Sequence, residues 1–290
     1  MKQIDGTVEV QGPGGWKRTL FGGLSLVLLL LLILVYVFPF YWMVTTSVKT
    51  FEEAIRFPPT FIPRTFDMIN NYRAAWTMAN FPHFARNSLV ITLITLVGQL
   101  LVTIPAAYAF AKKEFKFKGF LFGFILFDMM IPGQVTFIPI YVFLSNIGWL
   151  DTLWALTVPF FISSFGIFFV TQAFKQVPNE VIDAARTDNA TELQIILGIM
   201  VPMNKPVIVT ISLFTVIGKW NDYFWTLILT TSSKVRTLPF AVKSLFALGD
   251  GINMWNISMA GNVLLVAPLL IIYIFANKQI KQAFVYGGIK

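Results

Sequence analysis

The stretch EVIDAARTDNA, residues 180–190, is polar and rich in small side chains, although it lies between two long apolar runs. Pro178 suits the start of a helix, and Glu180 and Asp183 place negative charge in its first turns, where the helix dipole favours it. Asn189 tolerates the left-handed conformation that ends a helix, although Gly adopts it at less cost. The sequence therefore predicts a short helix that ends near Asn189.

A second short helix is predicted directly after the first. Thr191 and Gln194 have the spacing of a capping box, and an isoleucine-rich segment follows them. Ala184 and Ala185 favour a helix and carry almost no side-chain bulk, so one surface of the first helix can come very close to another protein. Composition alone leaves a solvated hairpin and a docking surface equally open.

The rest of the chain has the composition of a membrane protein. Hydrophobic residues make up 56% and charged residues 12%, and the mean hydropathy is +0.71. Runs of about twenty apolar residues can cross a bilayer as helices, whereas strands of a membrane barrel would alternate apolar and polar residues. An all-α integral membrane fold is predicted, with six transmembrane helices at about Phe21–Val44, Ser88–Ala111, Gly119–Leu144, Leu153–Phe174, Lys205–Thr230 and Asn256–Ala276.

Lysine and arginine indicate the orientation of these spans, because positive charges in short loops stay on the cytoplasmic side. The run KKEFKFK (112–118) is the strongest signal, and basic residues near both termini and near 175–205 fall on the same side. Basic residues also occur in the opposite loops 45–87 and 231–255, but longer loops follow the rule weakly. We expect cytoplasmic termini, with a tail at 1–20, a permease domain at 21–276 containing a cytoplasmic loop at about 175–204, and a tail at 277–290.

Several kinds of chemistry lack the residues they need. The chain has no Cys and one His, His83, which is expected to be an ordinary interfacial side chain rather than part of a metal site. The pair Gly218–Lys219 lacks the rest of a phosphate-binding loop, and no carboxylate pair suggests acid–base catalysis. The net charge of +8 reflects topology, and no basic run is interleaved with exposed aromatic residues as in a nucleic-acid site. The chain is not expected to be an enzyme or to bind a cofactor or metal itself.

The pattern E-x-x-D-A-A-x-x-D-x-A, followed by I-x-x-P, resembles the EAA loop of ABC-importer permeases. The matching residues are Glu180, Asp183, Ala184, Ala185, Asp188, Asn189, Ala190, Ile199 and Pro202. Asn189 stands where that family usually has Gly, a departure that would stiffen or shift the turn. The segments MIPGQVTFIPIYVFLSNIGWLDT (130–152), KWNDYFW (219–225), TLPFAV (237–242) and AFVYGGIK (283–290) resemble the carbohydrate-uptake branch, and in particular the second, six-span permease of the maltose-type pair.

This resemblance implies a helix–turn–helix coupling loop that docks on a cytosolic ATPase. It implies a second permease subunit, two cytosolic ABC ATPase subunits that bind ATP and magnesium, an extracytoplasmic solute-binding protein, and a bacterial inner (cytoplasmic) membrane location surrounded by lipid. Loops 45–87 and 231–255 would help to receive the solute. Trp76, Phe81 and Trp255 in or near them either take part or anchor the chain at the membrane interface.

Polar residues in the spans are candidates for a translocation path, because such groups are costly in lipid and tend to face cavities, partners or backbone. Asp128, Gln134 and Asn262 have this property, and Asp128 either lines the path or bonds to backbone freed by the bend at Pro132 and Gly133. In KWNDYFW, hydroxyl-binding and ring-stacking side chains suit a sugar, and the candidates are Lys219, Trp220, Asn221, Asp222 and Tyr223.

Other interpretations of these residues and of the whole chain remain open. Lys219 and Asp222 are three residues apart, so they can neutralise each other, and the patch can also pack against the partner permease. A secondary transporter would need internal repeats, and neither half of the chain repeats the other. A non-conducting assembly subunit would have no residue that matters for solute passage.

Overall fold

The computed structural model describes residues 15–247 and 253–286, and every regular element within them is helical. The first half of the chain forms α1 (Gly15–Ser47), α2 (Phe51–Ala54), α3 (Met68–Met78), α4 (Phe81–Lys112), α5 (Lys118–Asp128), α6 (Phe137–Asn146), α7 (Leu153–Thr157) and the 3-10 turn η1 (Val158–Phe160). The second half forms α8 (Ser164–Lys175), α9 (Asn179–Thr187), α10 (Glu192–Ile195), the π-helical turn η2 (Ile196–Met200), α11 (Val201–Met203), α12 (Lys205–Trp220), α13 (Phe224–Leu229), α14 (Leu238–Ser244), η3 (Leu245–Ala247) and α15 (Trp255–Tyr286).

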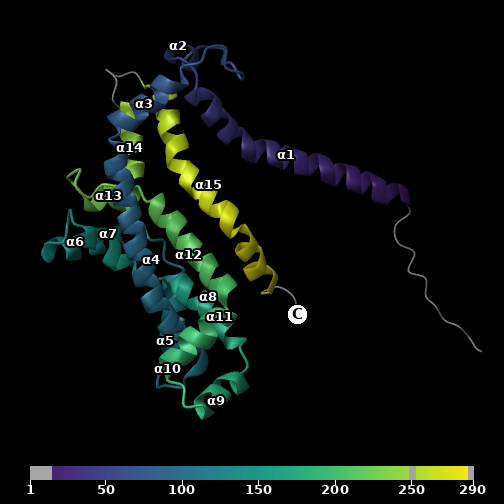
Figure 1. The fold of residues 1–290 in the computed structure, drawn as a ribbon, viewed down its shortest axis with the longest axis vertical. Helices are drawn as coiled ribbons and strands as arrows, with labels where there is room; N and C mark the ends of the chain where they lie inside the picture. The colour runs from purple at the N-terminus through teal and green to yellow at the C-terminus, as the bar shows by residue number, and fades with distance from the viewer. Residues whose placement is uncertain (1–14, 248–252, 287–290) are drawn as a thin grey trace, which may run out of the picture.

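Three long helices form the body of the molecule. α4, α12 and α15 run along its length, with α12 packed against both of the others and α8 packed along α4 (Figure 1). α1 contacts α15 and then leaves the body, so its apolar residues from Leu24 to Leu34 are each about half exposed. Surface of this kind is stable only in lipid or against another protein.

Four helical segments are long and apolar enough to span a membrane: Gly23–Ser47, Phe81–Lys112, Leu153–Lys175 and Trp255–Gln279. They correspond to the first, second, fourth and sixth predicted spans. A fifth is obtained if Glu192–Met203 and Lys205–Trp220 are counted together, and these two helices meet at an angle of 86°. The prediction of six spans and of two cytoplasmic termini therefore stays a prediction.

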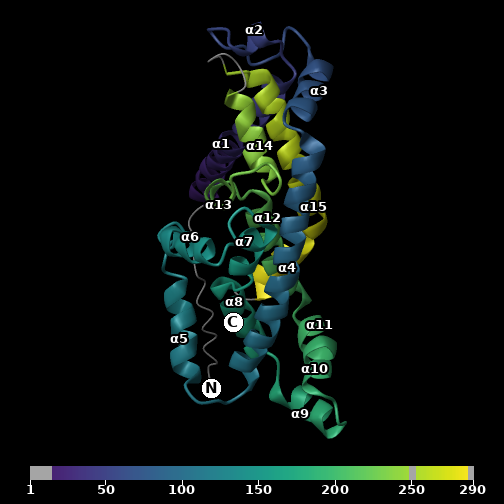
Figure 2. The same ribbon diagram turned by 90° about the vertical axis from the view of Figure 1, so that its left-hand side faces the viewer.

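The third predicted span is interrupted. α5 ends at Asp128 and α6 begins at Phe137, with Pro132 and Gly133 in the turn between them. α5 stands apart from α4 in Figure 2 and packs on α8. A Cβ atom placed on Gly119 or Gly123 would meet nothing within 4 Å, so the two glycines, which have GxxxG spacing, make no close helix contact with the described part of the chain.

The fifth predicted span and the predicted tails also differ from expectation. α12 stops at Trp220, three residues are non-helical, and α13 then begins at Phe224. α1 already begins at Gly15, and α15 continues to Tyr286, so the predicted tail 277–290 starts as helix. Residues 1–14 and 287–290 of the predicted tails lie outside the described residues, as do residues 248–252 of the predicted loop 231–255.

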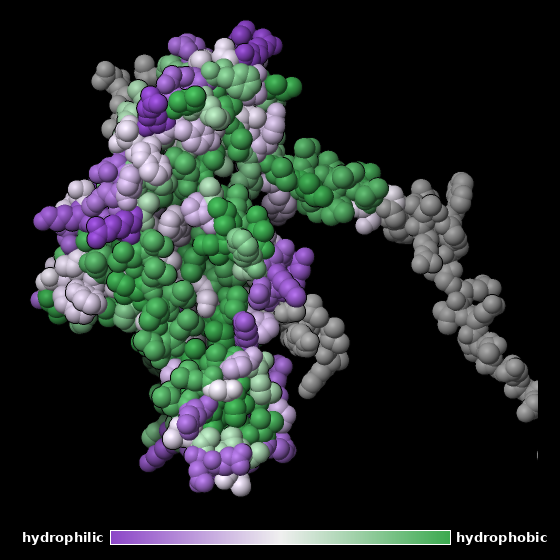
Figure 3. Space-filling model, in the orientation of Figure 1, coloured by the Kyte–Doolittle hydropathy of each residue, from purple (hydrophilic) through white to green (hydrophobic). Residues whose placement is uncertain are grey.

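The two ends of the molecule have different contents. α2 and α3 lie at one end and α9 and α10 at the other (Figure 1). Hydrophilic residues gather at both ends, and hydrophobic residues dominate much of the surface between them (Figure 3). This distribution places residues 175–204 and the loop 45–87 on opposite sides of the apolar region, as the charge pattern predicts.

Candidate functional site

Residues 179–203 form a helical hairpin at one end of the molecule, named here the 179–203 hairpin (Figure 2). Pro178 is the residue before α9, and Asn189 has a left-handed φ of 58°. Thr191 and Gln194 form both hydrogen bonds of the capping box at the start of α10. The local chemistry of the chain therefore builds this hairpin as the sequence predicts.

One face of the hairpin packs against the body. Ile182, 2% exposed, joins the fully buried Phe174, Ile195 and Met200 in the largest hydrophobic cluster among the described residues. Ala185 and Ala190 are half-buried against this cluster. A bulky side chain at Ala185 would therefore first disturb the chain's own packing, which makes that position a poor test of docking.

The opposite face is open to a partner. The acidic residues of the pattern are exposed, and Ala184 is exposed beside them, whereas Ile199 is half-buried and Pro202 is exposed. Three apolar side chains on the same hairpin are also exposed, at 37% for Val181, 64% for Leu193 and 57% for Leu197. The exposed residues of the pattern are Glu180, Asp183, Ala184, Asp188, Asn189 and Pro202.

Polar contacts fasten the hairpin to the end of α4. The Lys112 ammonium donates to the Val177 carbonyl at 2.5 Å and to Asn179 Oδ1 at 2.9 Å. The Glu192 carboxylate accepts from the Tyr108 hydroxyl at 2.6 Å and pairs with Lys113 at 2.5 Å. α9 and α10 are thus each tied to the same long helix.

Arg186 links α9 to the same carboxylate. Its guanidinium lies 3.3 Å from Asp183 and 3.4 Å from Glu192. The sequence does not reveal this arrangement, because Tyr108 and Glu192 are 84 residues apart and the basic run at 112–118 by itself predicts only topology. The sequence does contain one clue to this contact: Glu192 directly follows the capping residue Thr191, and a basic run ends the second predicted span.

Asp128 has a side-chain partner. Its carboxylate accepts a hydrogen bond of 2.5 Å from the Ser164 hydroxyl at the start of α8, rather than bonding to backbone freed by the break after α5. Both residues border an open pocket of about 590 Å³ whose other walls include Phe120 and Phe124. Gln134 is exposed in the turn between α5 and α6, apart from this pair.

The pairing expected within KWNDYFW is present. Lys219 and Asp222 lie 2.9 Å apart, with side chains 11% and 13% exposed. The second oxygen of Asp222 accepts from the Trp225 amide at 3.1 Å, which caps α13. The Lys219 ammonium also lies 3.1 Å from the centroid of the Phe160 ring. Lys219 therefore does not present an unpaired charge.

The remaining residues of this patch point in different directions. Trp220 is 8% exposed, and its indole nitrogen donates to the Leu265 carbonyl of α15 at 2.9 Å. Asn221 is exposed and bonds back to the Ile217 carbonyl, and the Tyr223 ring stacks on Phe240. Asn262, on α15, donates to the Ser258 carbonyl. Of the seven residues predicted from sequence, Lys219 and Asp222 pair with each other, Asp128 pairs with Ser164, and Gln134 is exposed in a turn. The other three, Trp220, Asn221 and Tyr223, make structural contacts.

The other end of the molecule is organised around Glu53. Its carboxylate is 7% exposed and accepts from the Thr60 hydroxyl, the Thr65 hydroxyl and the backbone amides of Arg64 and Thr65, at 2.5–3.1 Å. Burial opposes ionisation, but these hydrogen bonds outweigh it and lower the pKa of Glu53 from 4.5 to about 2. Lys49, 1% exposed, adds a 2.5 Å bond to the Thr60 carbonyl.

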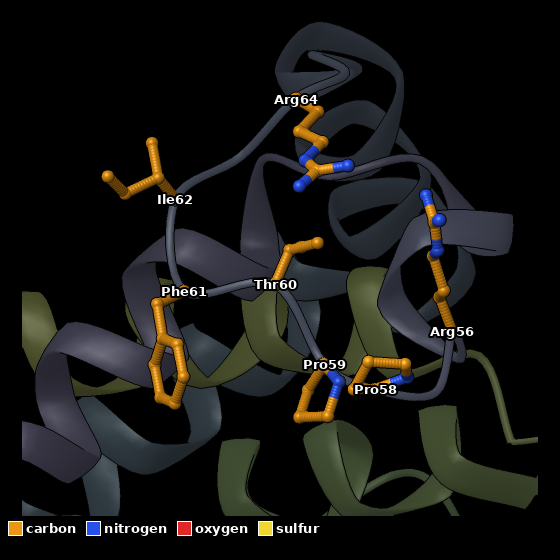
Figure 4. A pocket seen from close by; sticks show the side chains of 7 residues that line it. All are labelled: Arg56, Pro58, Pro59, Thr60, Phe61, Ile62 and Arg64. Atoms are coloured by element: carbon orange, nitrogen blue, oxygen red, sulfur yellow. The ribbon is translucent and has the colours of Figure 1, made fainter.

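This carboxylate holds a loop that carries an open pocket of about 510 Å³ (Figure 4). Arg56 and Arg64 flank the pocket, and Phe57 nearby is 92% exposed. The aromatic residues predicted for this side divide between two roles. Phe81 is 8% exposed and stacks on Trp76 at 4.8 Å, whereas Trp255 is 40% exposed and meets Phe246 edge-on.

His83 makes ordinary polar contacts. Its Nε2 atom lies 2.9 Å from the Ser233 carbonyl, at the edge of the body. Within residues 15–247 and 253–286, no three His, Asp or Glu side chains come close enough together to hold a metal ion.

Comparison with known proteins gives consistent matches over most of the chain. The model of the family described as "Binding-protein-dependent transport system inner membrane component" matches residues 99–285. A putative ABC transporter permease protein, ORF2 of Caldicellulosiruptor sp. (strain Rt8B.4), is 32% identical over 254 residues, covering 87% of this chain and 91% of its own. Protein LplC of Bacillus subtilis (strain 168) is 29% identical, with coverage of 87% and 88%.

A third relative and one solved structure extend the comparison. The sn-glycerol-3-phosphate transport system permease protein UgpE of Brucella abortus (strain 2308) is 26% identical over 273 residues, covering 92% of this chain and 95% of its own. A chain from the crystal structure of a bacterial ABC transporter involved in the import of the acidic polysaccharide alginate superposes with a TM-score of 0.82. The two chains are 23% identical, and the match covers 92% of this chain and 99% of the other. This similarity establishes the fold.

Proposed function

The chain belongs to the family of binding-protein-dependent transport system inner membrane components, and we propose that it is one of two permease subunits of an ATP-driven importer for sugars or oligosaccharides. As a permease component it is a multi-pass protein of the inner membrane rather than an enzyme. This membership argues against a secondary transporter and against a subunit with no part in transport.

The 179–203 hairpin is the observation that carries the coupling part of this proposal. Its exposed face combines acidic side chains, the small Ala184 and the apolar Leu193 and Leu197, which suits close docking on a second protein. Its other face is packed into the body and tied to α4. A push on the exposed face would therefore be passed to a helix that runs most of the length of the molecule.

The partners follow from this arrangement. Two cytosolic ATPase subunits, which would hold the ATP and magnesium, dock on this hairpin and on its counterpart in a second permease. A solute-binding protein docks at the opposite end, where the loop held by Glu53 presents Phe57 and the two arginines of Figure 4. The exposed apolar flank of α1 is covered by lipid or by the second permease.

For the path itself, we retain Asp128 and the Lys219–Asp222 pair as candidates. Asp128 and its partner Ser164 border one open pocket, and Lys219 of the second pair borders another, so a solute hydroxyl can exchange hydrogen bonds with them. Trp220, Asn221 and Tyr223 are better explained as structural residues, since each is engaged by a neighbouring backbone or ring. Gln134 lies in the turn after α5 and would act only if that turn borders the path.

The experiment is reconstitution of the chain with its partner permease, ATPases and binding protein in vesicles, followed by measurement of ATP-dependent sugar uptake. Ala184→Trp and Glu180→Lys should prevent recovery of the ATPases with the permeases, because both alter the exposed face without touching the inner cluster. Glu114→Lys is the matched charge reversal, since Glu114 is 92% exposed near the same end. Normal assembly of Ala184→Trp, or no uptake of any sugar by the native complex, would contradict the proposal.

A further inference from the structure

A small pocket with apolar walls and several polar groups lies between α4, the η1–α8 connection and α12. Its volume is about 200 Å³, well below the roughly 300–1,000 Å³ typical of sites for drug-sized ligands. It borders the same residue, Ile162, as the larger pocket of Asp128, so the two pockets adjoin. The lining residues that matter here are Thr95, Gln99, Phe160, Ser163, Thr215 and Lys219.

The uncharged side chains leave hydrogen-bonding capacity for a ligand. The Thr215 hydroxyl, which also lies 3.0 Å from the Ile211 carbonyl, donates to Gln99 Oε1 and so orients the amide group. The Gln99 amide nitrogen finds no acceptor within the described part of the chain. The Ser163 oxygen accepts from the Gly166 amide and keeps its own proton to donate. Thr95 is 1% exposed, and its hydroxyl has no partner among residues 15–247 and 253–286. Buried polar groups without partners are uncommon and call for an explanation.

The pocket carries no net formal charge. Lys219 is its one charged lining residue, and Asp222 neutralises it at 2.9 Å while the ammonium also rests on the Phe160 ring. An anionic group entering the pocket would have to compete with Asp222 for that ammonium. A neutral polyhydroxylated ring would instead use the amide and hydroxyl groups and lie against the apolar wall, which includes Ile162 and Phe214.

We infer that this pocket is a passage subsite for a single neutral sugar unit, held by Gln99, Ser163 and Thr215 and screened from uronic acids by the Lys219–Asp222 pair. The inference rests on the proposed transport function and adds a substrate class to it. The pocket is too small for an oligosaccharide, so a longer substrate would pass through it one unit at a time.

The direct test uses the absence of cysteine from this chain. Thr215→Cys in the complete importer complex is modified with methyl methanethiosulfonate, and labelling of this chain is followed by mass spectrometry. We expect a neutral sugar from a panel of glucose, xylose and mannose to slow modification about threefold or more at millimolar concentration. Glucuronate and galacturonate should not slow it. No protection by any neutral sugar that the native complex accumulates, or equal protection by a uronate, would overturn the inference.

Two sets of variants separate solute contact from structure. Gln99→Leu and Thr215→Val should each lower neutral-sugar uptake about fivefold, the value of one lost hydrogen bond, whereas Thr215→Ser should keep most of it. Ser212→Ala is the control, since that hydroxyl lies on the same helix and bonds only to the Ile208 carbonyl. Equal losses in Ser212→Ala and Thr215→Val would show a general helix defect and overturn the subsite.

A separate variant tests the role of the Lys219–Asp222 pair. Asp222→Asn keeps the oxygen that caps α13 but leaves the Lys219 ammonium unpaired. When Asp222→Asn is combined with Thr215→Cys, glucuronate should therefore protect the introduced thiol, whereas it gives no protection while the native pair is intact. No gain for glucuronate would refute the screening role.

ATP-dependent uptake by the native complex separates the two proposals. Uptake of uronates alone would refute this inference and leave the importer function standing. Uptake of no sugar would refute the importer function.

Discussion

Replacing Glu192 with alanine should separate ATP hydrolysis from transport. Its carboxylate is the point at which α10 meets α4, through the Tyr108 hydroxyl at 2.6 Å and the Lys113 ammonium at 2.5 Å. Arg186 of α9 reaches the same carboxylate at 3.4 Å. Alanine removes all three contacts but leaves the hydrophobic cluster under the hairpin intact, so the hairpin should fold and dock while its hold on α4 weakens.

The size of the effect can be worked from burial. Tyr108 is 3% exposed, so leaving its hydroxyl without an acceptor costs about 1–3 kcal/mol. Lys113 and Glu192 are 38% and 47% exposed, and a pair screened by solvent to that degree contributes only about 0.2–1 kcal/mol. A total near 2 kcal/mol corresponds to about a thirtyfold larger fraction of hairpins detached from α4.

The assay is the ratio of sugar uptake to ATP hydrolysis in vesicles containing the complete complex. Glu192→Ala should lower this ratio by up to about thirtyfold while hydrolysis continues. Glu192→Gln keeps an acceptor for Tyr108 and loses only the charge, so its ratio should fall about two- to fivefold. Glu114→Gln, which removes an exposed i,i+4 pair with Lys118 at the same end, is the control and should change nothing.

A double variant tests the cause. Tyr108→Phe removes the hydroxyl that Glu192→Ala leaves unpaired, so the two changes together should be less harmful than the sum of the two alone. The reasoning is refuted if Glu192→Ala keeps the native uptake-to-hydrolysis ratio. It is also refuted if the glutamine variant is as impaired as the alanine variant, because the buried hydrogen bond would then carry no weight.

Three further predictions concern stability and orientation. Because the pKa of Glu53 is lowered to about 2, the ionised carboxylate stabilises the 51–66 loop above about pH 4.5, and this stabilisation is lost as pH falls toward 2. Protease resistance of the loop should therefore fall over this pH range, and Glu53→Gln should abolish that pH dependence. A Cβ atom at Gly98 would lie 2.5 Å from the Phe161 ring, so Gly98→Ala should destabilise the chain by about 1–3 kcal/mol in detergent melting, whereas Gly123→Ala, with nothing within 4 Å, should not. In the variant Arg186→Cys, the thiol should react with an impermeant reagent only in opened cells. Labelling in intact cells would contradict the predicted cytoplasmic location of this loop.

Features that depend on residues close in sequence could be predicted from the sequence. The capping box of Thr191 and Gln194, the left-handed Asn189 and the Lys219–Asp222 pair each involve residues at most three positions apart. At this range, helix geometry alone brings side chains together, and the local residue types decide the outcome. The long apolar runs are equally local, which is why four of the six predicted spans correspond to long apolar helical segments.

Contacts between distant segments could not be predicted in this way. The Glu192–Tyr108 bond joins residues 84 apart, the Trp220–Leu265 bond joins residues 45 apart, and Thr215 and Gln99 are 116 apart. Hydropathy also counts apolar residues without reporting where a helix stops, so the third and fifth runs look continuous in the sequence although their helices are broken. The indole nitrogen of Trp220, a candidate for solute contact, bonds to the α15 backbone, and only packing reveals that direction.

The positions of the helix breaks indicate how the chain faces its surroundings. Irregular backbone cannot be exposed to lipid tails, because its amide and carbonyl groups would lack partners there. The short elements α6, α7 and α13 meet in one cluster, where Leu144, Leu156 and Leu229 are each at most 2% exposed, and Asp151 binds the amides of the 231–232 turn beside it. In Figure 1 this cluster lies on the side of α4, α12 and α15 opposite to the projecting α1, a regular helix that is apolar around its exposed length. The α1 side is therefore the one that lipid or an apolar partner can cover, and the side with the broken helices must meet water or protein, which is where a solute path requires them.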